Sequence, residues 1–135
     1  MGIESGTVSF QPSGLQNQGV GRVVTSADKG VKRPCISLDD FLGDPLCVPC
    51  LIKMDIEGAE WLALQGAQRT LGQRKAPLAI LLEVHPEEIG DLGGTVQGVR
   101  GLLERIGLEV HALTPNGLES LDSGKTYRFW WAESN

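Results

Sequence analysis

The 135-residue sequence contains no apolar stretch long enough to cross a lipid bilayer. Its first residues include neither the basic region nor the apolar segment that directs a protein to secretion. We therefore expect a soluble, cytoplasmic protein that has no membrane partner.

Basic clusters are also absent, since 12 lysines and arginines face 17 acidic residues and the formal net charge is −5. No run of lysine and arginine carries the interleaved aromatic residues that would bind phosphates and bases. We expect no nucleic-acid partner.

Cysteine is scarce, and the odd count of three argues against a disulfide framework. Cys47 and Cys50 form a C-x-x-C pair, a spacing that can serve zinc binding or redox exchange. Because no second C-x-x-C accompanies it, a reduced structural role is favoured, and we expect no bound metal. A metal or redox module that uses Cys47 and Cys50 stays open as an alternative function.

Length and composition, with 41% hydrophobic residues, suit one globular domain over residues 1–135 and do not suit two. Residues 7–10 alternate like a short strand. Residues 11–30 are rich in Gln, Gly, Ser and Asn without apolar periodicity, which predicts a long flexible loop.

An acidic cluster follows the apolar residues 51–54, which read as a short strand leading into a helix. Asp55 and Glu57 lie two positions apart and would point to the same side, Gly58 permits a sharp exit, and Glu60 falls in the first helical turn. Ligands of open α/β sheets bind at the carboxyl ends of strands. The alternative is that these carboxylates only cap the helix and complement its dipole.

A second strand, at residues 78–84, also ends in titratable groups, with Glu83 and His85 on one side. Its continuous apolar run predicts a strand buried on both faces of a parallel sheet. A histidine beside a carboxylate at a strand end is a candidate catalytic group, although a lone histidine is more often structural. Trp61 follows the acidic cluster and could stack on a ligand, although packing is its commoner use.

The rest of the pattern predicts alternating elements. Helices are expected at residues 37–42, with Ser37 as N-cap, at 63–71 and at 96–106. Strands are expected at residues 108–113 and 126–131. This order indicates an α/β fold built of parallel βαβ units, with a closing pair of strands that can be antiparallel.

Four sequence blocks carry a family resemblance: SLDDFL at 37–42, LIKMDIEGAE at 51–60, LQGA at 64–67 and LLEVHP at 81–86. In order and spacing, residues 31–85 resemble the second half of an FkbM-family methyltransferase. The resemblance implies a Rossmann-like, class I methyltransferase fold, S-adenosylmethionine as cofactor, and methyl transfer to a hydroxyl of a small molecule or glycan.

The sequence departs from the family before these blocks. It lacks the glycine-rich loop and the acidic ribose-binding residue of the family, so the cofactor-binding residues are unknown. The expected fold is an N-terminally truncated, mostly parallel sheet with a C-terminal antiparallel strand. The strand at 51–55 would then expose an apolar edge, which a second copy or a partner chain could cover. A non-catalytic half-domain or subunit is the corresponding alternative function.

Methyl transfer requires alignment of the acceptor and removal of its proton. We assign His85, Asp55 and Glu57 as the catalytic residues, with His85 or Asp55 as general base. An imidazole accepts protons nearer to neutral pH than a carboxylate does. Glu60, Glu83 and Trp61 are the predicted substrate-binding residues. Together with Glu57, the two glutamates would orient the acceptor or His85.

Overall fold

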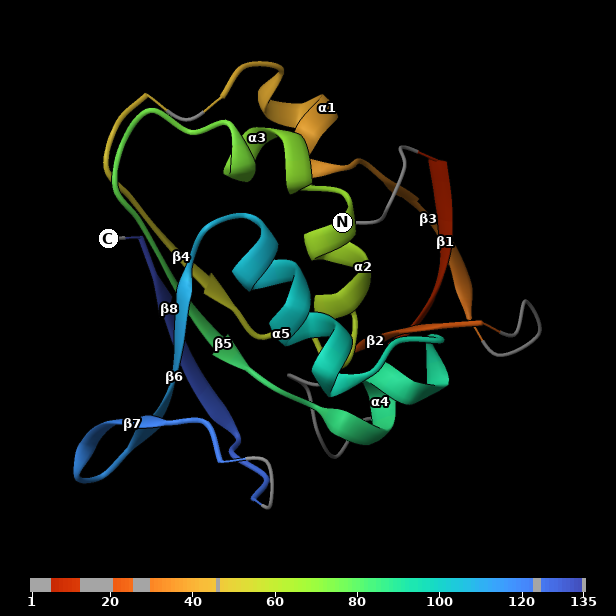
Figure 1. Ribbon diagram of the computed structural model, residues 1–135. Coiled ribbons are helices and arrows are strands. Elements are labelled where there is room, and N and C mark those ends of the chain that lie inside the picture. The colour runs from red at the N-terminus through yellow and green to blue at the C-terminus, as the bar shows by residue number, and fades with distance from the viewer. Residues whose placement is uncertain (1–5, 13–20, 26–29, 46, 123–124, 135) are drawn as a thin grey trace.

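The computed structural model describes residues 6–12, 21–25, 30–45, 47–122 and 125–134. These residues form two β-sheets and a set of helices, so the protein is a mixed α/β structure (Figure 1). None of the helices in these ranges has the length and apolar character that would let it span a membrane.

The smaller sheet is antiparallel, with strand order β2-β1-β3. Its strands are β1 (Gly6–Gln11), β2 (Arg22–Val24) and β3 (Val31–Cys35). The strand predicted at residues 7–10 lies within β1 and is confirmed. The prediction of a continuous loop over residues 11–30 is wrong, because residues 22–24 pair with β1 through backbone hydrogen bonds. The polar composition of the segment does not indicate this pairing. Residues 13–20 and 26–29 of that loop lie outside the described residues.

The larger sheet has the strand order β4-β5-β8-β6-β7. Its strands are β4 (Cys50–Met54), β5 (Leu78–Glu83), β6 (Glu109–Thr114), β7 (Gly117–Ser120) and β8 (Phe129–Glu133). The prediction of a mostly parallel sheet is wrong, since among the described strands only β4 and β5 pair in parallel. The cause is the predicted antiparallel strand, β8, which lies between β5 and β6 and separates them.

Five helices occur in the described ranges: α1 (Leu38–Leu42), α2 (Glu60–Gln65), α3 (Gln68–Gly72), α4 (Pro86–Asp91) and α5 (Val96–Arg105). Ser37 is the N-cap of α1, as predicted, and its Oγ accepts a hydrogen bond from Asp40 N. The single helix predicted at 63–71 is wrong. It divides into α2 and α3 because the Asp39 carboxylate accepts hydrogen bonds from the backbone N–H groups of Arg69 and Thr70 and caps a new helix there.

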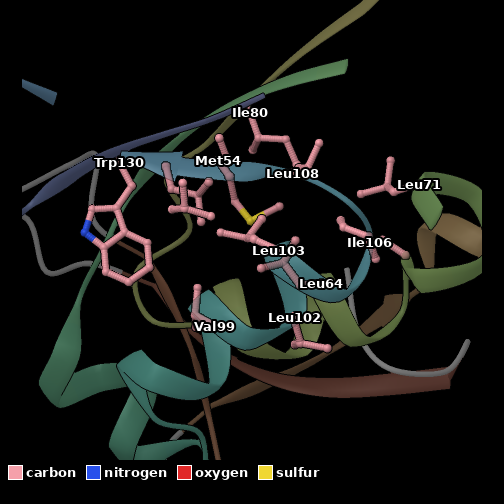
Figure 2. Close-up of a cluster of buried hydrophobic side chains, with 14 of the residues drawn as sticks. Met54, Leu64, Leu71, Ile80, Val99, Leu102, Leu103, Ile106, Leu108 and Trp130 are labelled. Carbon is pink, nitrogen blue, oxygen red and sulfur yellow. The ribbon is translucent and has the colours of Figure 1, made fainter. Parts of the chain in front are cut away.

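One face of the larger sheet forms the core together with α2, α3 and α5 (Figures 1 and 2). Ile80 and Leu82 of β5 are fully buried and belong to the same apolar cluster as Leu64 and Leu103 of these helices. This packing supplies most of the apolar burial that stabilises the fold.

The opposite face of the larger sheet is only partly covered. Leu51, Leu81, Phe129 and Trp131 share this face, which we call the open face. Leu51 is 65% exposed and Leu81 is half-buried. The prediction that β5 is buried on both faces is therefore wrong for the described residues. The predicted apolar edge is present, because β4 pairs on one side only, with β5, within the described part of the sheet.

Candidate active site

The acidic cluster lies on a tight turn between β4 and α2. The strand ends at Met54, so Asp55 and Glu57 are oriented by the turn and not by strand alternation. Glu57 has a φ of 52° and Gly58 a φ of 94°, both in the left-handed region. A non-glycine residue in this region is strained, and such residues concentrate at functional sites. The strained backbone of Glu57 therefore marks this turn as a candidate site.

The buried side chain of Glu60 stabilises this turn. Its side chain is 0% exposed, and its Oε1 accepts hydrogen bonds from the backbone N–H groups of Ile56, at 3.3 Å, and Gly58, at 3.2 Å. The same oxygen lies 3.1 Å from His85 Nδ1. Glu60 Oε2 is buried without a hydrogen-bond partner among the described residues. Glu60 is thus positioned to orient His85, and its role in substrate binding stays a prediction.

His85 presents its other ring nitrogen to two carboxylates. Where Glu60 is ionised it can only accept a hydrogen bond, and a neutral imidazole would then donate from Nδ1 and present Nε2 as a proton acceptor. Nε2 lies 3.7 Å from Glu57 Oε2 and 3.7 Å from Glu83 Oε1, too far for hydrogen bonds. The ring is 11% exposed. A general base oriented by a buried carboxylate requires contacts of this kind, and the assignment of His85 as base stays a prediction.

Two cations that the sequence did not single out complete the cluster. Lys53 Nζ lies 2.9 Å from Asp55 Oδ2, and Arg128 forms an ion pair with Glu83. Arg128 reaches Glu83 because its neighbour Phe129 pairs with Glu83 in the β5–β8 register. The alternation of residues 126–131 placed Arg128 on a strand, but nothing in the local sequence indicates that β8 lies beside β5.

A metal ion is the other group that this cluster could hold. The ligand atoms of Asp55, Glu83 and His85 lie within 4.8 Å of one another. However, Lys53 and Arg128 already offset the charge of the two carboxylates. The expectation of no bound metal stays a prediction.

Trp61 lies next to Glu60 in the sequence, but its indole packs elsewhere. A Cβ built at Gly94 or Gly98 would lie 2.5 Å or 2.6 Å from the ring of Trp61, so the indole fills the space beside the start of α5. The structure therefore places Trp61 in packing contact with this segment, and its role in substrate binding stays a prediction.

Cys35, Cys47 and Cys50 all lie in the described residues and form no disulfide bonds there. Cys47 is exposed, with its Sγ 3.3 Å from the carbonyl oxygen of Pro45. Within the described residues, the cluster of side chains that could bind a metal is Asp55, Glu83 and His85, and it contains no cysteine. The C-x-x-C alternative gains no support from this arrangement.

A cavity of about 610 Å³ opens beside the acidic turn, between the smaller sheet and the end of β4. Its lining combines apolar residues with charged ones and includes Phe10, Arg33, Met54, Asp55 and Glu57. The cavity is thus lined by Asp55 and Glu57, two of the three residues that were predicted to be catalytic.

Comparison with protein families gives a match to the model described as the methyltransferase FkbM domain, over residues 2–110. Comparison with curated proteins gives no match. Comparison with solved structures gives none either. The matched segment contains all six predicted site residues, whereas Arg128 and β8 lie beyond it.

Proposed function

We propose that this chain, which belongs to the FkbM methyltransferase family, transfers a methyl group from S-adenosylmethionine to a hydroxyl oxygen. Family membership supports methyl transfer as the reaction class and a Rossmann-like origin for the β4-α2-α3-β5 unit. The observation that carries the O-methyl assignment is the His85–Glu60 pair, because a hydroxyl must lose its proton during transfer and His85 Nε2 is oriented to accept one.

The 610 Å³ cavity fits the cofactor in size and in chemistry. When bound, S-adenosylmethionine supplies a methyl group on a positively charged sulfur. Phe10 and Met54 offer apolar surface for an adenine ring, Arg33 offers a cation for a carboxylate, and Glu57 offers negative charge for the sulfonium. These residues would hold the cofactor.

In this proposal the chain acts mainly by positioning and proton transfer. The acceptor hydroxyl would donate a hydrogen bond to His85 Nε2, which would take its proton, while the cofactor would supply the methyl group and its sulfur would keep the electron pair of the broken C–S bond. Glu60 holds the ring and stabilises the imidazolium that results. Glu57 Oε2 and Glu83 Oε1 each lie 3.7 Å from Nε2, so both carboxylates face the nitrogen that would take the proton.

A calorimetric titration of the whole chain with S-adenosylmethionine tests the cofactor site. We expect saturable binding, and we expect Glu57→Gln to weaken it about tenfold, because loss of one charged contact removes about 1.5 kcal/mol. Glu104→Gln is the matched control, since Glu104 is exposed on α5 and pairs with Arg100. Absence of binding by folded protein would favour the non-catalytic half-domain instead.

We also propose that a second copy of the chain covers the open face and the β4 edge. The open face is apolar at its centre, where Leu81 and Trp131 pair, and charged at its sides. Lys53 lies on the β4 side, and Glu109 and Glu133 lie opposite each other on the β6 side. Two copies related by a two-fold axis would bring the basic side of one to the acidic side of the other.

Light scattering during size exclusion tests this interface. We expect a dimer for the wild-type chain and a monomer for Leu51→Lys, because the lysine would place a charge in the apolar contact. Phe41→Lys is the control, since Phe41 on α1 is 67% exposed, close to the 65% of Leu51, and lies outside the face. A monomeric wild-type protein would contradict the proposal.

A further inference from the structure

A second cavity, of about 310 Å³, lies between the start of α5 and the segment that precedes β8. Its lining includes Pro86 and Tyr127. Pro86 directly follows His85, the proposed base, and Tyr127 directly precedes Arg128, which pairs with Glu83. The cavity, which we call the acceptor cavity, is therefore lined by the residues that directly adjoin His85 and Arg128 in the chain.

The inner surface of the acceptor cavity is aromatic and apolar. Trp130 is buried, and its Nε1 donates to the backbone oxygen of Tyr127 at 3.1 Å, so the indole offers ring surface and no hydrogen bond. Val96 and Leu121 extend this surface. A flat apolar wall of this kind suits the C–H face of a sugar or another saturated ring.

The rim of the acceptor cavity is basic although the whole chain carries a net charge of −5. Arg100 and Lys125 line it, against one carboxylate, Asp122. Arg100 uses its Nε for an exposed ion pair with Glu104, and such pairs contribute little to stability. Its guanidinium has further N–H donors in the planar arrangement that binds a carboxylate or a phosphate.

We infer that this cavity binds the methyl acceptor and that the acceptor is a hydroxylated ring bearing one anionic group, a carboxylate or a phosphate. The apolar wall contacts the ring, the basic rim binds the anion, and a ring hydroxyl points to His85. This assignment of substrate class rests on the proposed methyl transfer, but binding to the cavity can be measured without the cofactor.

The test is an NMR titration of the ¹⁵N-labelled whole chain, without S-adenosylmethionine. The probes are glucuronate, glucose 6-phosphate and neutral glucose, and the readout is the indole N–H signal of Trp130, assigned by its loss in Trp130→Phe. We expect saturable shifts with one or both anionic probes and at least about tenfold weaker binding of glucose, as the loss of one charged contact predicts. A carboxylate or phosphate preference follows from which probe binds more tightly.

Two charge variants separate the cavity from general electrostatic attraction. Arg100→Gln and Lys125→Gln should each weaken binding of the anionic probe about tenfold. Arg105→Gln, on the same helix but outside the cavity lining, should leave binding unchanged. Equal binding of glucose, no shift with any probe, or an equal effect of Arg105→Gln would overturn the inference. Failure of the cofactor titration, by contrast, would overturn only the methyl transfer.

Discussion

Replacing His85 with glutamine should lower the rate of methyl transfer by about 10²–10⁴-fold, the range typical for loss of a general base. Glutamine can still donate a hydrogen bond to Glu60 but cannot take the proton of the acceptor hydroxyl at neutral pH. The affinity for S-adenosylmethionine should be unchanged, because His85 does not line the 610 Å³ cavity. Single-turnover rates with saturating cofactor, together with calorimetry, measure both quantities.

The second histidine provides the matched control for this experiment. His111 lies on β6, with its Nε2 3.4 Å from the exposed carboxylate of Glu109, and contacts none of the carboxylates around His85. His111→Gln should therefore keep the full rate. An unchanged rate in His85→Gln would refute the assignment of His85 as base and leave Asp55 as the remaining candidate.

Replacing Gly58 with alanine should lower the free energy of unfolding by about 3 kcal/mol, from two separate costs. Its φ of 94° is unfavourable for any residue with a Cβ. The added Cβ would also lie 2.3 Å from the Cβ of Glu88 and 2.6 Å from its backbone carbonyl carbon, so α4 must move away from the turn. Urea denaturation followed by circular dichroism measures the loss.

Gly117→Ala measures the conformational part of that effect alone, so the difference between the two variants gives the steric part. Gly117 has a φ of 112°, but no atom lies within 4 Å of a Cβ built there. It should therefore show only the conformational cost, about 1 kcal/mol. If both substitutions destabilise the protein equally, contact between the turn and α4 contributes nothing, and the turn is not held by α4.

Sequence patterns predicted the helices and strands that are determined by residues close together in the chain. The cap at Ser37, the alternation in β1, the apolar run of β5 and the helical spacing of α5 are each complete within one short segment, and the structure has all four. The break between α2 and α3 could not be predicted in this way. It depends on Asp39, which lies 30 positions before Arg69 and caps the second helix through a tertiary contact.

The sequence predicted that the site lies at the ends of two strands. It did not predict which of its side chains are buried or which ones pair. Parallel pairing of β4 and β5 brings Asp55 and Glu57 beside Glu83 and His85, as the positions of these residues suggested. The fully buried position of Glu60 follows from the left-handed turn before it, which no periodicity indicates. The partner of Glu83 depends on strand order, which is a property of the whole sheet.

The position of β8 between β5 and β6 constrains how the larger sheet assembles during folding. Its two neighbours precede it in the chain, and the α4-α5-β6-β7 segment separates β5 from β8. Closing so long a connection costs entropy before any pairing energy is gained, so this step should be slow. Until β8 docks, β5 and β6 both have unpaired inner edges, and a partly folded chain is prone to aggregate through them. The last strand to pair therefore protects the sheet as well as completing it.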